Sequence, residues 1–208
     1  MNARMIGEGL ARAVVVFVLA TVVLGVAYPF AVGAVGQLAF PWQANGSVIE
    51  VDGVKYGSQL VGQPFSDMKH LWGRPTVANA TAFQGEDGQP LLWYAPENLS
   101  PASDEFAQRV QQRVEAIRAA HPDQANEPVP SELVTVSGSG FDPHISPAAA
   151  DYQVGRIAQA TGRSEEEVRA IIRQCTEEPL LGAIGQARVN VLEVNLMLDG
   201  VLDAVPNR

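Results

Sequence analysis

The chain has 208 residues and a formal net charge of −9, from 14 Lys and Arg against 23 Asp and Glu. Proteins that bind nucleic acid neutralise its phosphates largely with Lys and Arg, so this acidic balance argues against a nucleic-acid partner. The single cysteine excludes an intramolecular disulfide framework and a cysteine-rich metal site.

The distribution of charge divides the chain into two chemically different parts. No charged residue occurs between Arg12 and Glu50, and residues 13–36 within this stretch are almost continuously apolar. A helix of this length is roughly 36 Å long, which is enough to cross a hydrocarbon core of about 30 Å. The stretch therefore predicts one transmembrane helix.

The flanking charges predict how this helix is oriented. Arg4, Arg12 and the α-amine precede it, opposed only by Glu8, and no charge follows it until Glu50. Because positive residues favour the cytoplasmic side of a membrane, we expect the body of the protein to be exported. The expected division is a cytoplasmic tail, a transmembrane helix and an extracytoplasmic domain, at residues 1–12, 13–36 and 37–208.

A cleaved signal peptide is the alternative interpretation of the apolar stretch. A basic start, an apolar run and small residues around Val32, Gly33 and Ala34 fit the pattern of a cleavage site. The run is longer than the roughly 7–15 residues of a signal peptide, which favours a retained anchor. Both interpretations export residues 37–208.

Aromatic residues and prolines lie at the expected exit of the helix. Tyr and Trp are enriched at membrane interfaces, and proline ends helices, so an outer aromatic belt is expected there, with Pro29 and Pro41 marking the helix exit. Apolar residues at this place have no domain core of their own to join, which favours contact with another membrane protein. The candidate contact residues are Tyr28, Pro29, Phe30, Phe40, Pro41, Trp42 and Gln43.

Extended segments are predicted where short β-branched runs lie between turn residues. Asn45-Gly46 and Asp52-Gly53 are such turns, and they favour a hairpin. The region from Asn79 to Ser103 is otherwise expected to be a long surface loop. The predicted extended segments are 47–51, 54–56, 60–61, 91–94, 132–136 and 189–198, with a helix as the alternative for the second half of the last.

Helices are predicted from their caps and their apolar spacing. Ser103 precedes an apolar series at helical spacing, Ser146-Pro147 is a favoured start, and Ser164 with Glu167 forms a capping box. In the first of these helices, the solvated face is assigned to Arg109, Gln111, Gln112, Arg113 and Arg118. The predicted helices are 103–120, 146–162 and 164–175. Strands and helices in this order predict an α+β fold, with one transmembrane helix before a single α/β-mixed domain.

Few residues are candidates for chemistry of their own. Residues 157–174 have the pattern of a helix-turn-helix, but three glutamates occupy the start of the second helix, so two packed amphipathic helices are favoured. Cys175 falls on the apolar stripe of its helix, which predicts a buried thiol. His70, His121 and His144 are scattered, and we predict no catalytic residue and no metal site.

A Gly-rich loop is the remaining candidate site. Ser137-Gly138-Ser139-Gly140 could present backbone N–H groups to an anion, although a plain turn between a strand and a helix is favoured. We keep this loop, together with Asp142, as candidate site residues.

Motifs along most of the chain resemble a known family. Tyr28-Pro29, followed by the run from Phe40 to Ser47, resembles the opening of the C subunit of the bacterial Kdp potassium-transporting ATPase. The segment from about Thr81 to Asp104 departs from the family's pattern, because only Asn98-Leu99 remains of a Gly-Gly-Ser-Asn-Leu-Gly run. The resemblance continues through Gly57-Ser58, Gly62-Gln63, Gly73-Arg74-Pro75, Leu133-Val134-Thr135, Ser137-Gly138-Ser139-Gly140, Asp142, Ile145-Ser146-Pro147, Val189-Asn190-Val191-Leu192 and Asn195-Leu196.

This resemblance implies a non-catalytic accessory subunit of an ATP-driven, high-affinity potassium uptake complex in the cell inner membrane. The implied partners are a channel-like potassium-binding subunit, a P-type ATPase subunit that hydrolyses ATP, and a small single-helix subunit. It also implies that the subunit stabilises the assembly, acts as a catalytic chaperone that raises the ATP affinity of the ATPase subunit, and binds ATP. The alternative is a membrane-anchored exported adaptor or binding domain unrelated to potassium transport.

Overall fold

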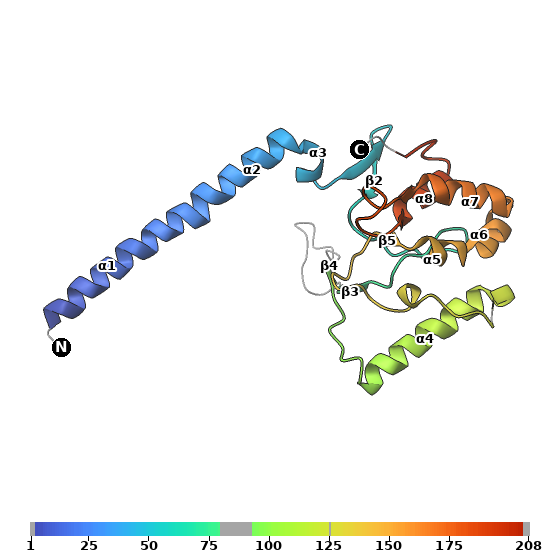
Figure 1. Cartoon of the computed structure of the whole chain (residues 1–208), viewed down its shortest axis with the longest axis horizontal. Coiled ribbons are helices and arrows are strands. Elements are labelled where there is room, and N and C mark those ends of the chain that lie inside the picture. Colours follow the sequence, from blue (N-terminus) through green and yellow to red (C-terminus); the bar gives the residue numbers. More distant parts are fainter. Residues whose placement is uncertain (1–2, 80–92, 125, 206–208) are drawn as a thin grey trace. The chain divides into compact units, whose positions relative to one another are not determined.

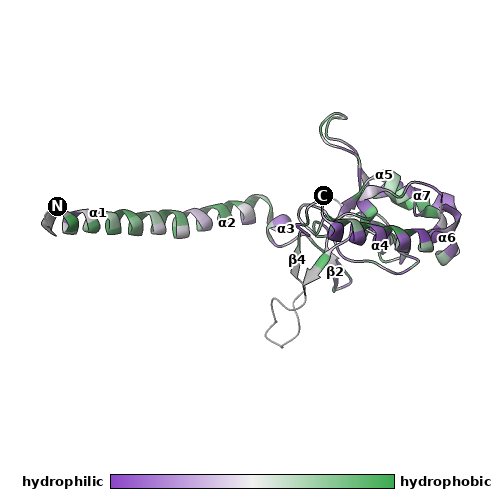
Figure 2. Ribbon diagram, turned by 90° about the horizontal axis from the view of Figure 1, so that it is seen from below, coloured by the Kyte–Doolittle hydropathy of each residue, from purple (hydrophilic) through white to green (hydrophobic). Residues whose placement is uncertain are grey.

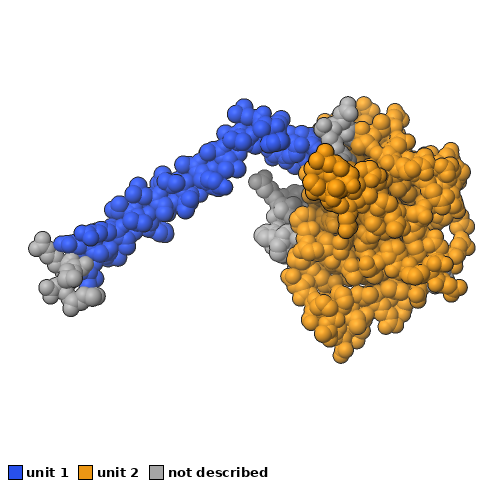
Figure 3. Space-filling view, in the orientation of Figure 1, with its two compact units in different colours: residues 1–48 blue, residues 49–208 orange. Residues whose placement is uncertain are grey.

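A computed structural model describes residues 3–79, 93–124 and 126–205 of the chain (Figure 1). The predicted α+β fold is confirmed: a long apolar helix at the N-terminus is followed by a domain of helices and small sheets. The chain forms two compact units, Met1–Val48 and Ile49–Arg208 (Figure 3).

An almost unbroken helix fills the first unit. Helix α1 (Ala3–Val22), the π-helical turn η1 (Val23–Ala27) and helix α2 (Tyr28–Ala39) follow one another directly. Apolar residues cover most of its length (Figure 2). The segment Ile6–Ala39 has 34 residues and is, within the described part of the chain, the one helix long and apolar enough to cross a membrane. At 1.5 Å per residue it is about 51 Å long.

The helix continues through Pro29, so the prediction that Pro29 marks the helix exit is wrong. The backbone N–H of Tyr28 donates to the carbonyl of Val23, five residues earlier, which makes a π turn directly before the proline. Such a wider turn relieves the clash between a proline ring and the carbonyl four residues before it. A local change of helical pitch thus accommodates Pro29.

The helix ends ten residues later. Phe40 leaves helical geometry with φ −140° and ψ 55°, and the single-turn helix α3 (Pro41–Ala44) follows it. Pro41 is therefore at a helix boundary, as predicted. The side chain of Asn45 donates to the carbonyl of Pro41 and pairs with Gln37, which closes the turn after the long helix.

The second unit combines three small sheets with helices of 3 to 17 residues (Figure 1). Strands β1 (Val48–Val51) and β2 (Val54–Ser58) form the predicted hairpin, and the other described strands are β3 (Val77–Asn79), β4 (Trp93–Ala95), β5 (His144–Ile145), β6 (Thr176–Glu177) and β7 (Arg188–Asn190). Strand β3 pairs antiparallel with β4, and β7 lies between β5 and β6 in an antiparallel sheet. The helical elements are α4 (Asp104–Ala120), η2 (Pro122–Gln124), η3 (Ser131–Leu133), α5 (Pro147–Asp151), α6 (Val154–Thr161), α7 (Glu165–Gln174) and α8 (Val191–Leu198).

The three predicted helix starts are confirmed. The side chains of Ser103, Ser146 and Ser164 each accept a hydrogen bond from the backbone N–H three residues later, and Ser164 also forms the complete capping box with Glu167. The predicted helix 146–162 is nevertheless divided into α5 and α6. The break falls beside Gln153, whose buried side-chain amide binds both the N–H and the C=O of Trp72.

Two predicted strands are wrong. Residues 132–136 form a 3-10 turn and a loop, because the N–H groups of Val134 and Thr135 both donate to the carbonyl of Ser131 in place of a neighbouring strand. Leu60-Val61 lies in a turn instead of an extended segment.

The two remaining extended predictions hold in part. Residues 189–198 divide into β7 and α8, because the side chain of Asn190 caps the helix by accepting from the N–H of Glu193. Of the strand predicted at 91–94, residues 93 and 94 belong to β4, while residues 91 and 92 lie outside the described residues.

Helix α8 forms the centre of the core. All eight of its residues are buried, as expected for a helix surrounded by other elements. The amphipathic helices α6 and α7 turn at Gly162, which has φ +72°, and pack as the two helices predicted in place of a helix-turn-helix. Cys175 is 1% exposed, and its sulfur lies 3.4 Å from the sulfur of Met197, so the prediction of a buried thiol is confirmed.

Candidate functional site

The candidate contact residues of the first unit form two separate groups along the chain. Tyr28, Pro29 and Phe30 are inside the long helix, whereas Phe40, Pro41, Trp42 and Gln43 follow its end. Phe30 and Phe40 are roughly 15 Å apart along the helix, so the two groups do not share one interfacial layer. The aromatic side chains of both groups are exposed. Their role as contacts with a membrane or a partner stays a prediction.

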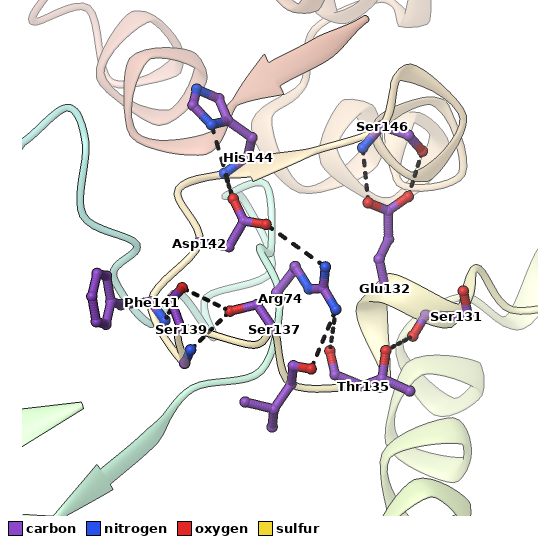
Figure 4. A network of polar contacts seen from close by, with 12 residues as sticks. Arg74, Ser131, Glu132, Thr135, Ser137, Ser139, Phe141, Asp142, His144 and Ser146 are labelled. Carbon is purple, nitrogen blue, oxygen red and sulfur yellow. Dashed lines mark hydrogen bonds and ion pairs between the residues drawn. The ribbon is translucent and has the colours of Figure 1, made fainter. Parts of the chain in front are cut away.

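The predicted Gly-rich loop is a turn closed by hydrogen bonds among its own residues (Figure 4). The N–H of Gly140 donates to the backbone carbonyl and the side-chain oxygen of Ser137, at 3.1 and 2.9 Å. The N–H of Phe141 donates to Ser139 Oγ at 3.4 Å, and the two serine hydroxyls are 3.2 Å apart. These donors are directed into the loop.

Close packing explains why glycine occupies this loop. Gly140 has φ +80°, and a Cβ atom on it would lie 2.3 Å from the carbonyl oxygen of Ala95, at the end of β4. Gly138 in the same loop has no atom within 4 Å of such a Cβ. On the other side, Gly62 donates its N–H to the carbonyl of Phe141 at 2.7 Å. The loop therefore joins segments that are distant in sequence.

Asp142 links the loop to a second motif (Figure 4). Its carboxylate accepts the backbone N–H of His144 at 3.0 Å and lies 3.7 Å from Nη1 of Arg74. Nη2 of Arg74 donates to the carbonyls of Thr135 and Val136 at 3.4 and 3.3 Å. The structure thus brings together the Gly73-Arg74-Pro75 motif and the Ser137–Asp142 motif, which sequence patterns alone left unconnected.

Glu132 belongs to the same region but was missed by the sequence patterns (Figure 4). Its carboxylate accepts hydrogen bonds from the backbone N–H of Ser146, at 2.9 Å, and from the hydroxyl of Ser146. The same hydroxyl oxygen caps α5 by accepting the N–H of Ala149. No sequence pattern pointed to Glu132, because it lies 14 positions before Ser146 and the fold brings the two together.

A buried carboxylate lies in the segment that departs from the family's pattern. Glu97 accepts hydrogen bonds from Arg109 at 3.0 Å and from Arg113 at 2.9 and 3.2 Å. The hydrogen bond from Arg113 is the main cause that holds the pKa of Glu97 below its ordinary value. Assigning Arg113 to the solvated face was therefore wrong, because its side chain is 23% exposed and fastens α4 to the residues after β4. The assignment holds for Gln111, Gln112 and Arg118, which are exposed, and for Arg109, whose side chain is 42% exposed although it also binds Glu97.

A groove of about 310 Å³ separates part of α4 from the segment before β3. It is lined by residues that include Phe65, Trp72, Arg74, Arg113, Ile117 and Leu133. The guanidinium of Arg74 already binds Asp142 and two backbone carbonyls, and that of Arg113 binds Glu97 and the carbonyl of Val134. Among the described residues no three His, Cys, Asp or Glu side chains gather as a metal site. The geometry of this region is that of a structural junction.

A second polar cluster, buried in the core, holds the loop that contains Trp72. Arg156 is 6% exposed and donates to the carbonyls of Met68 and His70, to the side chain of Gln153, and from Nε to Nε2 of His121 at 3.0 Å. Its guanidinium lies 4.4 Å from the centre of the Trp72 ring. Burial lowers the pKa of Arg156 to about 10, so it remains charged at neutral pH.

His121 must be neutral to take part in this cluster. It is 3% exposed, its Nδ1–H donates to the carbonyl of Ile117 at 2.7 Å, and its Nε2 accepts from Arg156. A proton on Nε2 would remove that hydrogen bond and place two cations side by side. Burial, followed by the charge of Arg156, accordingly lowers the pKa of His121.

We expect this histidine to make the folded state sensitive to mild acid. Because its pKa is lower folded than unfolded, its stabilisation is complete above about pH 6.5 and is lost as the pH falls below that value. The parent chain should lose about 1 kcal/mol more unfolding free energy between pH 7.5 and 5.5 than the His121→Gln variant. Urea unfolding at both pH values measures this difference, and identical pH dependence in the two chains would contradict the assignment.

Comparison with known proteins agrees with the family resemblance of the sequence motifs. The family model of KdpC, the c chain of the K+-transporting ATPase, matches residues 10–200. The chain is 50% identical over 190 residues to the potassium-transporting ATPase KdpC subunit of Clostridium perfringens, covering 91% of this chain and 94% of that protein. It is 47% identical over 188 residues to the subunit of Sorangium cellulosum, covering 90% and 95%. The chain therefore belongs to the KdpC family of potassium-transporting ATPase subunits.

Proposed function

We propose that this chain is the accessory subunit that stabilises the assembly of an ATP-driven, high-affinity potassium uptake complex. The observation that carries the proposal is the match of helix and body together, over 92% of the chain, with a relative named as the KdpC subunit of a potassium-transporting ATPase. Its partners are then a channel-like potassium-binding subunit, a P-type ATPase subunit and a small single-helix subunit. The match favours this role over that of an exported adaptor unrelated to potassium transport.

The proposed setting is a single pass through the inner membrane, with the N-terminus in the cytoplasm and the body outside. The asymmetry of Arg4 and Arg12 before the apolar helix, against no charge before Glu50 after it, supports this orientation. The helix is longer than the roughly 30 Å of a hydrocarbon core. Its excess length, together with Phe40–Gln43, gives the membrane subunits of the complex a surface to contact.

The subunit is further proposed to raise the ATP affinity of the ATPase subunit, as a catalytic chaperone, without its exported body binding ATP. ATP is cytoplasmic, and the proposed orientation leaves about twelve residues on that side. Loops that bind phosphate direct their N–H groups at the ligand. Ser137–Gly140 is a poor candidate for such a loop, because the N–H of Gly140 donates back to Ser137. The effect on ATP would then pass through subunit contacts.

Two measurements test this proposal. In the purified complex, removal of the chain should raise the KM for ATP of potassium-stimulated hydrolysis by about fivefold or more, the scale of typical coupling between sites. The full chain alone in detergent should show no saturable binding of labelled ATP at physiological salt. An unchanged KM would contradict the chaperone role, and an isotherm with micromolar affinity would contradict indirect action.

A further inference from the structure

The connection between β6 and β7 is a small hairpin with an exposed apolar tip. Leu180 and Ile184 pair across it, with hydrogen bonds of 2.9 and 3.0 Å in the two directions, and the N–H of Gly182 donates to the carbonyl of Pro179. The side chains of Leu180, Leu181 and Ile184 are 67%, 88% and 62% exposed. The tip is therefore an ordered apolar surface whose side chains take no part in the core.

Leu181 also has an unfavourable backbone conformation. Its φ is 55°, in the left-handed region, which costs a branched L-residue about 1–2 kcal/mol. Glycine or asparagine would fit this position better. An exposed leucine here helps neither the local backbone nor the core, and such local strain is characteristic of functional sites.

The charges around the tip favour a protein over a lipid surface as its occupant. Residues 179–187 carry no charge, the preceding residues are Glu177 and Glu178, and Arg188 is paired with Glu177 at 2.6 Å. Segments that enter lipid headgroups combine apolar residues with Lys or Arg that bind anionic lipids. Acidic flanks oppose that interaction, and so does the charge of residues 37–208, which carry 12 Lys and Arg against 22 Asp and Glu once Arg4, Arg12 and Glu8 are subtracted.

We propose that Leu180, Leu181 and Ile184 form an anchor that inserts into an apolar pocket of another subunit of the potassium-transporting ATPase. This rests on the proposed function, which supplies the partner. The hairpin is held in shape by its own hydrogen bonds and by the β6–β7 pairing, so little conformational freedom is lost on binding. A few ordered apolar side chains of this kind commonly carry most of the binding energy of an interface.

Leu181→Asn separates binding from folding. Asparagine tolerates the left-handed conformation, so the variant should unfold at the same temperature as the parent or higher. The full chain is produced with the other subunits, the complex is purified in detergent, and exchange with excess untagged chain is timed. We expect exchange to be about tenfold faster or more for Leu181→Asn, whereas the control Val54→Asn, which removes another exposed apolar residue, should exchange like the parent.

The outcomes distinguish the two proposals. If the parent chain fails to co-purify with any subunit, the proposed function fails and this inference fails with it. If the parent co-purifies but Leu181→Asn exchanges at the parent's rate, the hairpin anchor is contradicted and the proposed function stands. The same holds if Val54→Asn exchanges as fast as Leu181→Asn.

A probe on the hairpin distinguishes another subunit from lipid and from a second copy of the chain as the occupant. Because Cys175 is buried, a maleimide dye labels an Ala183→Cys variant selectively and leaves the three apolar side chains intact. Shielding of the dye from iodide only in the complex supports the proposal. Equal shielding in phosphatidylglycerol vesicles that contain the chain alone would assign the tip to lipid, and shielding that follows self-association of the chain would assign it to a second copy. Both results would overturn the proposal.

Discussion

Gly140→Ala should lower the free energy of unfolding of the body by roughly 2–5 kcal/mol. About 1–2 kcal/mol of this comes from forcing an L-residue to adopt a positive φ. A further 1–3 kcal/mol, approximately, comes from the new methyl group pressing on the carbonyl of Ala95, which lies 2.3 Å from the position of the added Cβ. The backbone around Ala95 cannot yield easily, because β4 is paired with β3 there. Urea unfolding of the full chain in detergent, followed by circular dichroism, measures the loss.

Gly138→Ala is the matched control in the same loop. Nothing lies within 4 Å of a Cβ at Gly138, so the substitution should change stability by less than about 1 kcal/mol. If both variants were as stable as the parent chain, the loop would not be a packed junction between Ala95 and Gly62. If both were equally destabilised, a requirement of the whole loop would have to replace the close contact as the explanation.

Two arginines in the middle of the long helix should remove the chain from the membrane. Leu19→Arg and Leu24→Arg together oppose insertion by about 5–7 kcal/mol, at about 2.5–3.5 kcal/mol for each arginine at a helix centre. We expect the double variant to be absent from carbonate-washed membranes, whereas the parent remains in them. Immunoblotting of the membrane and soluble fractions measures this partition.

The same two charges placed before the apolar segment provide the control. Gly7→Arg with Gly9→Arg adds them where no atom lies within 4 Å of the new Cβ atoms and where positive charge favours the cytoplasmic orientation. This variant should stay in the membrane. Retention of the Leu19→Arg, Leu24→Arg chain would contradict the anchor, and loss of both variants would show that charge alone, regardless of depth, disturbs the chain.

Local signals explain why the helix starts were predictable. Ser103, Ser146 and Ser164 cap their helices through contacts within three residues, and such contacts can be recognised in a sequence. The strand prediction for 132–136 was wrong because a short run of apolar residues is typical of a strand. Leu133 and Val134 are indeed buried, but the backbone forms a tight turn at Ser131. Burial alone does not distinguish a strand from a loop packed on the core.

Non-local contacts explain what could not be predicted. Gln153 binds the backbone of Trp72 across 81 positions, and Gln59 donates to the buried Glu193 across 134 positions. No period or cap signals such pairs. In the candidate site, likewise, Arg74 and Asp142 were marked only as separate motifs of a resembling family, and the fold supplies their contact. Glu97 and Glu132 carried no recognisable pattern at all.

The stoichiometry of the purified complex tests the central claim most directly. The full chain is tagged, extracted from membranes in mild detergent without crosslinking, and the co-purifying subunits are quantified by mass spectrometry. An accessory subunit of the potassium-transporting ATPase predicts recovery of the channel-like and ATP-hydrolysing subunits in equal amounts with the chain. Recovery of the chain without them, from cells that produce all the subunits, would contradict the account.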